Sequence, residues 1–193
     1  MLIEPVVDTV PRPLEAGTYY VDDPFPVQAS FTVPNGWEVW AYTTAASQVN
    51  LAKPEVGEVS LEIVDNVSAD PCTSEPLDPP VGPSVDELVA ALSNLSEFGF
   101  EVSPATDITI DGFRGKQLAL QAPPNETPEC DGWLTWRTTT RQNGVGPGES
   151  NEVRILDVDG VRLMISVAHG PAELPPGARS EIDAVVDSIQ IGQ

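Results

Sequence analysis

The sequence predicts an α+β domain in which an antiparallel sheet, built from hairpins, is flanked by two helices. Three observations support this fold class. Short segments of alternating apolar and polar residues recur along the chain, and they arrive as neighbouring hairpins rather than as strand–helix–strand units. Two longer segments carry apolar residues at helical spacing. The 20 prolines and 15 glycines among 193 residues suit short strands that are joined by turns.

The domain is expected to span residues 17–193. Residues 1–16 are rich in proline and valine, and this composition is typical of the end of a linker or tail. From Thr18 onward the pattern becomes short and strand-like. A length of 193 residues suits one domain, so a single α+β domain is expected after the tail.

Four segments have the pattern of strands or hairpins. In residues 59–64 one face carries Val59, Leu61 and Ile63, and the other carries Ser60 and Glu62. This alternation predicts a strand. The other three segments are centred on Asn-Gly or Asp-Gly, dipeptides that tolerate positive φ. These predicted hairpins are residues 31–39 around Pro34-Asn35-Gly36, residues 107–121 around Asp111-Gly112, and residues 153–167 around Asp159-Gly160.

Two segments predict helices. The first begins at Ser84, because Ser84 and Glu87 have the spacing of a capping box, and Gly99 ends it. The second begins near Pro175-Pro176, since proline is favoured in a first helical turn. Each has an apolar stripe that is expected to face the core: Val85, Leu88, Leu92 and Leu95 in the first, and Ile182, Val185, Val186 and Ile189 in the second.

The charge balance is strongly acidic. Thirty acidic residues face nine basic ones, which gives a net charge of −21. Such a surface repels nucleic-acid phosphates and anionic lipid headgroups, so no nucleic-acid partner is expected. No apolar run approaches the roughly 20 residues that cross a bilayer, so no transmembrane segment is expected within residues 1–193. A membrane anchor elsewhere in the full-length protein stays open.

Cys72 and Cys130 are the two cysteines of the chain, and both lie in loops rich in proline, aspartate and threonine. Three interpretations are open: a structural disulfide, two buried free thiols, or a redox pair. A redox pair usually has Cys-x-x-Cys spacing, which is missing here. We therefore expect a structural disulfide, which indicates an oxidising compartment.

Few residues carry the chemistry of a catalytic or metal site. His169 is the single histidine, and no Gly-x-Ser-x-Gly motif accompanies it, so no catalytic residue is predicted. Asp157 and Asp159 lie beside a turn and are weak candidates for a cation site, although turn chemistry alone explains Asp159-Gly160. We expect no metal site and no cofactor.

Aromatic residues are the candidates for a ligand pocket. Trp40 and Tyr42 alternate to the face opposite Val39, and Trp133 and Trp136 lie just beyond Cys130. Aromatic side chains near a loop-rich rim line ligand pockets in many proteins. The alternative is that these four side chains cover the second face of the sheet.

Several blocks of sequence resemble a group of exported domains from high-GC Gram-positive bacteria. These domains occur as lipoproteins or as the outer parts of membrane-anchored proteins, and most lack an assigned function. The pattern of hairpins and two helices is also similar to the Mog1/PsbP-like fold, which includes the LpqN-type lipoproteins. The resemblance to this fold implies that the antiparallel sheet is curved. The resemblance spans about residues 17–191, implies an extracellular or cell-surface location, and supplies no catalytic residues. The blocks are Asp65–Cys72, Pro79–Leu88, Ile108–Phe113, Gly115-Lys116, Cys130 with its following tryptophans, Ile155–Leu163 and Val185–Ile189.

These observations predict a non-catalytic extracytoplasmic domain that binds a ligand or a protein partner, as a sensor or an envelope scaffold. The partner, an unknown protein or small molecule, is not identified by the sequence. The alternative is a carboxylate-dependent hydrolase acting on cell-envelope glycan. Such an enzyme needs two carboxyl groups about 5–10 Å apart in a cleft.

Overall fold

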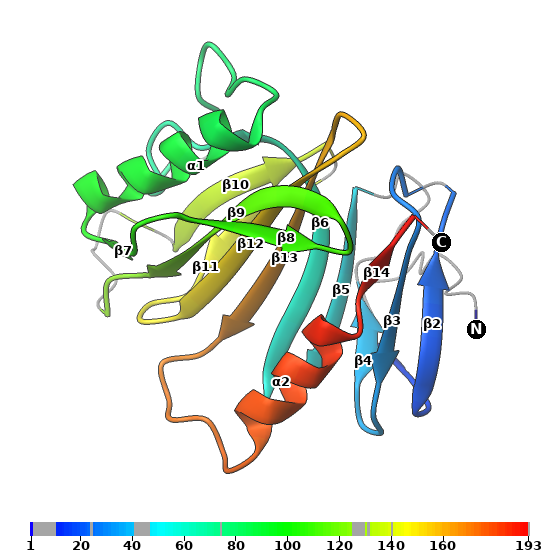
Figure 1. Cartoon of the computed structure of the whole chain (residues 1–193). Helices are drawn as coiled ribbons and strands as arrows, with labels where there is room; N and C mark the ends of the chain where they lie inside the picture. Colours follow the sequence, from blue (N-terminus) through cyan, green and yellow to red (C-terminus); the bar gives the residue numbers. More distant parts are fainter. Residues whose placement is uncertain are drawn as a thin grey trace.

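The computed structural model describes residues 1, 11–23, 25–40, 47–73, 75–124, 130, 132–139 and 141–192. In these residues the chain forms two antiparallel sheets and two α-helices, α1 (Val85–Ser93) and α2 (Ala178–Asp187), with a 3-10 helix (Asn94–Phe98) directly after α1 (Figure 1). Neither α-helix is long and apolar enough to cross a membrane. The predicted α+β class, with a sheet flanked by two helices, is confirmed.

The main sheet has eleven strands, which pair without a parallel contact. Eight of them follow one another in the order β1-β4-β5-β6-β13-β12-β9-β7, while β8 pairs with β9, β10 with β6 and β11 with β10. Their bounds are β1 (Arg12–Pro13), β4 (Glu38–Trp40), β5 (Gln48–Lys53), β6 (Gly57–Val67), β7 (Glu101–Val102), β8 (Thr106–Ile110), β9 (Phe113–Gln121), β10 (Trp133–Thr138), β11 (Gln142–Val145), β12 (Ser150–Val158) and β13 (Val161–His169).

A second, smaller sheet contains β2 (Gly17–Val21), β3 (Ala29–Val33) and β14 (Gln190–Ile191). Together with α2 it covers one face of the main sheet, and the core between them contains Phe31, Trp37 and Leu61. On the other face α1 packs against β9 and β12, over a second core that contains Leu92, Ile155 and Met164 (Figure 1).

Local signals account for the helix ends and two of the hairpins. The backbone N–H of Glu87 donates to Ser84 Oγ at 3.2 Å, and the N–H of Ser84 donates to Glu87 Oε2 at 3.0 Å, as the capping box predicts. The β8–β9 and β12–β13 hairpins turn at Asp111-Gly112 and Asp159-Gly160, and both residues of each pair have positive φ. Helix α2 begins at Ala178, just after the predicted Pro175-Pro176.

The predicted hairpin over residues 31–39 is wrong. Strand β3 pairs with β2 and β14 in the small sheet, whereas β4 pairs with β1 and β5 in the main sheet. The Asn35-Gly36 turn therefore carries the chain from one sheet to the other. Phe31 and Trp37 are both fully buried in the same core. Packing the two sheets face to face buries both side chains, and this outweighs direct pairing of β3 with β4.

The packed structure also includes residues that were expected to be tail. Arg12 and Pro13 pair with Val39 and Glu38 at the edge of the main sheet. Leu14 is buried in the first core, and its backbone N–H donates to the carbonyl oxygen of Trp37 at 2.8 Å. Residues 12–14 of the expected 1–16 tail thus belong to the domain.

The predicted disulfide between Cys72 and Cys130 is confirmed, with the two Cα atoms 4.5 Å apart. It joins the loop between β6 and α1 to Cys130, three residues before β10 begins at Trp133. A hydrogen bond from Leu134 N–H to the carbonyl oxygen of Pro71, at 2.6 Å, lies beside it. A structural disulfide of this kind is compatible with a location outside the cytoplasm.

Candidate functional site

The sheet face that carries α1 is divided into an apolar half under the helix and a polar half beside it. Asn50 on β5 lies opposite Ser60 on β6, and Ser60 lies opposite Ser166 on β13. Directly opposite residues of antiparallel strands share a face. Gln48 lies opposite Glu62 on that same face. We call Gln48, Asn50, Glu58, Ser60, Glu62 and Ser166 the polar half of the sheet.

The side chains of the polar half are unusual because they are polar and yet almost fully buried. Gln48, Asn50, Ser60, Glu62 and Ser166 are each no more than 4% exposed. Charged residues are almost never fully buried unless they are paired, and buried polar groups cost free energy unless they are hydrogen-bonded. Each of these side chains therefore needs an explanation from its partners.

Glu62 is at the centre of a hydrogen-bond network. Trp136 Nε1 and Asn143 Nδ2 donate to its Oε2 at 2.7 and 2.8 Å, and Ser166 Oγ donates to its Oε1 at 2.9 Å. Burial raises the pKa of Glu62 to about 7, although the hydrogen bonds from Trp136 and Ser166 act in the opposite direction. Because a serine hydroxyl can donate or accept, Ser166 can satisfy both protonation states of this carboxyl group.

Glu58 lies on the same strand as Glu62, nearer the groove described below. Ser60 Oγ donates to its Oε1 at 2.9 Å. Burial raises the pKa of Glu58, the hydrogen bond from Ser60 lowers it, and the negative charge of Glu149 raises it again. The positive charge of Arg141 lowers the pKa of Glu58 and also that of Glu62. The guanidinium group is thus within electrostatic range of both carboxyl groups.

Among the residues that the structure describes, two acceptor atoms of the polar half have no partner. Gln48 Nε2 donates to Asn143 Oδ1 at 3.1 Å, but its Oε1 accepts no hydrogen bond. Asn50 Oδ1 is likewise buried and without a partner. Leaving one such acceptor unsatisfied costs about 1–3 kcal/mol. The structure therefore retains two carbonyl oxygens that only a donor from outside this network can satisfy.

A groove of about 630 Å³ opens beside the polar half, and Glu58 belongs to both. We call it the acidic groove, because Glu38, Glu55, Glu58, Glu149 and Glu173 line it. Trp40 forms part of its wall and lies opposite Asn50 across the β4–β5 ladder. The guanidinium carbon of Arg141 lies 5.6 Å from the centre of the Trp40 ring, a cation–π contact.

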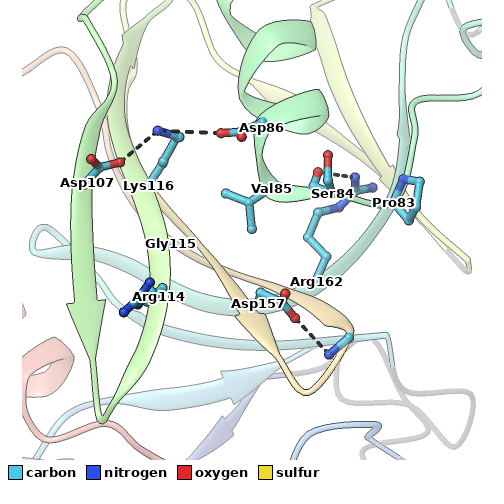
Figure 2. Close-up of a pocket in the computed structure, with 11 residues that line it drawn as sticks. Pro83, Ser84, Val85, Asp86, Asp107, Arg114, Gly115, Lys116, Asp157 and Arg162 are labelled. Atoms are coloured by element: carbon cyan, nitrogen blue, oxygen red, sulfur yellow. Dashed lines mark hydrogen bonds and ion pairs between the residues drawn. The ribbon is translucent and has the colours of Figure 1, made fainter.

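A second groove, of about 570 Å³, lies between the start of α1, the β8–β9 hairpin and the β12–β13 turn (Figure 2). Two of its basic residues, Lys116 and Arg162, already stabilise the fold. Lys116 Nζ is 2.8 Å from Asp107 Oδ1 and 3.6 Å from Asp86 Oδ1. Arg162 donates to the carbonyl oxygens of Gly82, Ser84 and Val64. These contacts fasten the start of α1 to the sheet, so this groove is the weaker candidate.

The structure separates the four predicted pocket aromatics. Trp40 lines the acidic groove, and Trp136 donates to Glu62 beneath it. Trp133 and Trp136 both belong to the core under α1, where Trp133 packs edge-on against Phe100 at 5.5 Å between ring centres. Tyr42 lies outside the described residues. Trp40 therefore lines the groove, Trp136 links the core under α1 to the polar half, and Trp133 packs within that core.

Asp157, Asp159 and His169, which the sequence analysis also considered, lie outside the polar half. Asp157 Oδ1 accepts from the backbone N–H of Gly160 at 2.8 Å, and Asp159 lies in the turn itself, so turn geometry accounts for both aspartates. His169 lines the acidic groove, and its Nδ1 lies 3.1 Å from the carbonyl oxygen of Gly170. Within the described part of the chain, no three histidine, cysteine, aspartate or glutamate side chains form a metal-binding group.

The residues at the centre of the site were missed in the sequence. Gln48, Asn50, Glu58 and Glu62 do not form a recognised motif. The available signal was the polar face of residues 59–64, because a charged residue in the middle of a central strand is uncommon. That signal indicates an unusual face, but it does not reveal which partners cover it.

No known protein family matches the sequence, and no curated protein matches it significantly. Among solved structures, a protein from Bacteroides thetaiotaomicron is 11% identical with a TM-score of 0.41, over 86% of this chain and 45% of that chain. This chain thus spans less than half of the Bacteroides protein. The solution structure of cyanobacterial PsbP (CyanoP) from Synechocystis is 14% identical with a TM-score of 0.42, over 85% of this chain and 86% of that chain. At TM-scores below 0.5, neither structure bears on ligand or chemistry.

Proposed function

We propose that this chain is a non-catalytic binding domain that acts outside the cytoplasm, as a sensor or an envelope scaffold, and that the acidic groove with the polar half is its binding site. The disulfide supports the location, since structural disulfides persist in oxidising compartments. The sequence blocks that resemble exported domains of high-GC Gram-positive bacteria support an extracellular or cell-surface position. The ligand is a small molecule or a segment of a partner protein.

The observation that carries this proposal is the pair of unpartnered acceptors, Gln48 Oε1 and Asn50 Oδ1. Folding alone does not favour them, because an apolar side chain of similar size would avoid the cost of a buried unsatisfied oxygen. Natural proteins retain such groups mainly where they serve binding or chemistry. Their position on the face between Trp40 and Glu62 links them to the groove rather than to the core under α1.

Chemical-shift mapping tests the location of the site. We expect a panel of amines, short peptides and envelope glycan fragments to contain a saturable ligand that shifts the indole N–H signals of Trp40 and Trp136. The variant Asn50→Leu should abolish the shifts, while Arg114→Ala, which alters the second groove, should leave them unchanged. A saturable ligand whose shifts map to the second groove, with Trp40 and Trp136 unaffected, would contradict the proposal.

A second candidate function, a carboxylate-dependent hydrolase of envelope glycan, is favoured by one observation. Glu58 and Glu149 line the same groove, and Glu149 raises the pKa of Glu58. A carboxyl group with a raised pKa beside a second carboxylate is the arrangement of a general acid and its partner. Release of reducing sugar from envelope glycan that is lost in Glu58→Gln but kept in Glu97→Gln would establish this enzyme and overturn the non-catalytic proposal.

A further inference from the structure

We infer that the acidic groove recognises a guanidinium or primary ammonium group on its ligand, and that the guanidinium of Arg141 occupies this position in the free protein. The inference rests on the proposed function, because it names the ligand class of the same groove. Three features carry it: the Arg141–Trp40 contact, the charges that line the groove, and the unpartnered acceptors of the polar half.

The contact between Arg141 and Trp40 places a cation against an aromatic side chain that lines the groove. A guanidinium carbon 5.6 Å from the ring centre is within the range in which the face of a tryptophan attracts positive charge. Trp40 itself is fixed by the β4–β5 ladder, where it lies opposite Asn50. The aromatic wall is therefore preorganised, while the cation that it holds is at the end of a long, flexible side chain.

The charges around Trp40 favour a positively charged ligand. Five glutamates line the groove: Glu38, Glu55, Glu58, Glu149 and Glu173. The lysine of the groove, Lys53, is already paired, since its Nζ lies 2.6 Å from Glu181 Oε1 and also donates to the carbonyl oxygen of Asn35. A cleft lined by one sign of charge raises the local concentration of the opposite charge and rejects anions.

Hydrogen bonding narrows the ligand class further. Glu58, Gln48 Oε1 and Asn50 Oδ1 are all acceptors, and the two amide oxygens have no donor. A guanidinium group carries five N–H donors and an ammonium group three, and neither carries an acceptor. A donor-only cation thus matches a groove that five carboxyl groups line, and its N–H groups reach Gln48 Oε1 or Asn50 Oδ1 only if the side chains around these buried atoms move.

The side chain of Arg141 can move away from Trp40 without disturbing the fold. Its backbone N–H donates to Thr138 Oγ1 at 3.2 Å, and its carbonyl oxygen accepts from Thr138 N–H at 2.9 Å. These bonds close the turn between β10 and β11 through the backbone and Thr138. Because Arg141 is an exposed residue, rotation of its side chain is enough to vacate Trp40. A ligand cation would then replace it.

Calorimetric titration tests this replacement. The probe is agmatine, a small guanidine, with neutral N-acetylcitrulline amide as its control, at about physiological ionic strength so that long-range attraction to the net negative charge is screened. We expect Arg141→Ala to bind agmatine about tenfold more tightly than the unmodified protein. Trp40→Leu and Glu58→Gln should bind it at least fivefold more weakly. Arg114→Ala loses the same charge outside the groove and should match the unmodified protein.

A second titration distinguishes the source of the cation. It uses a five-residue peptide with blocked ends that carries one arginine, compared with the same blocked peptide carrying citrulline. Tighter binding of the arginine peptide than of agmatine supports a protein partner, and the reverse order supports a free small guanidine or amine. Equal binding of arginine and citrulline probes, or no agmatine binding to Arg141→Ala, overturns the inference.

Different results would contradict the proposed binding site and the inferred class of ligand. If a neutral ligand shifts the Trp40 and Trp136 signals while agmatine does not bind, the groove is a binding site and the cation inference is wrong. If shifts map only to the second groove, the proposed binding site is wrong as well.

Discussion

Removal of the disulfide by the double substitution Cys72→Ala and Cys130→Ala is expected to lower the free energy of unfolding by about 4 kcal/mol. The bridge spans a sequence separation of 58 residues, and the chain-entropy model gives about 4 kcal/mol for a loop of this length. This is a large part of the 5–15 kcal/mol that is typical of a domain. Urea unfolding, monitored by tryptophan fluorescence in oxidising buffer, measures the difference.

Reduction of the disulfide in the unmodified protein is the control for this experiment. A reducing agent should destabilise the unmodified protein by a similar amount and leave the double variant unchanged. A difference below about 1 kcal/mol between oxidised and reduced protein would show that the contacts around Pro71 and Leu134 hold the loop without the bridge. The structural role given to the cysteines would then be wrong.

The stability of the protein should fall between about pH 4.5 and pH 7 because of Glu62. Its pKa is raised from 4.5 to about 7 in the folded state. Below pH 4.5 the carboxyl group is protonated in both the folded and the unfolded chain, so it contributes no pH dependence there. As the pH rises, the unfolded chain loses this proton first, and unfolding is favoured until the folded chain also loses it near pH 7. At about 1.4 kcal/mol per unit, the loss is about 3 kcal/mol.

Glu62→Gln isolates this contribution from the other acidic residues. The amide oxygen can accept from Trp136 and Asn143, and the amide nitrogen can donate to Ser166, so the network keeps its partners. We expect the free energy of unfolding of the variant, minus that of the unmodified protein, to rise by about 3 kcal/mol between pH 4 and pH 8. Parallel pH profiles for the two proteins would show that folding leaves the pKa of Glu62 unchanged, and would contradict this prediction.

The parts of the fold that were predictable depend on short-range chemistry. Asp111-Gly112 and Asp159-Gly160 favour tight hairpin turns wherever they occur, and Ser84 with Glu87 caps a helix without help from the rest of the chain. Strand pairing is different. The residues around Asn35-Gly36 have a hairpin pattern, but whether β3 pairs with β4 depends on competing partners that are distant in the sequence.

The site was less predictable than the fold for the same reason. Alternation in residues 59–64 indicates a polar face, and the simplest expectation is that such a face meets water. Glu62 is instead covered by partners at positions 136, 143 and 166, and these partners are supplied by three other strands. Trp133 and Trp136 are only three residues apart and both pack in the core under α1, yet Trp136 also donates to Glu62.

The central claim is that the polar half is maintained for binding at the expense of stability, and the variant Asn50→Leu tests it most directly. Asn50 Oδ1 is buried without a partner, so leucine, of similar size, removes an unsatisfied acceptor. We expect the free energy of unfolding to rise by about 1 kcal/mol, and agmatine binding, measured on the Arg141→Ala background, to be lost. A variant that is less stable and still binds agmatine with unchanged affinity would contradict the claim.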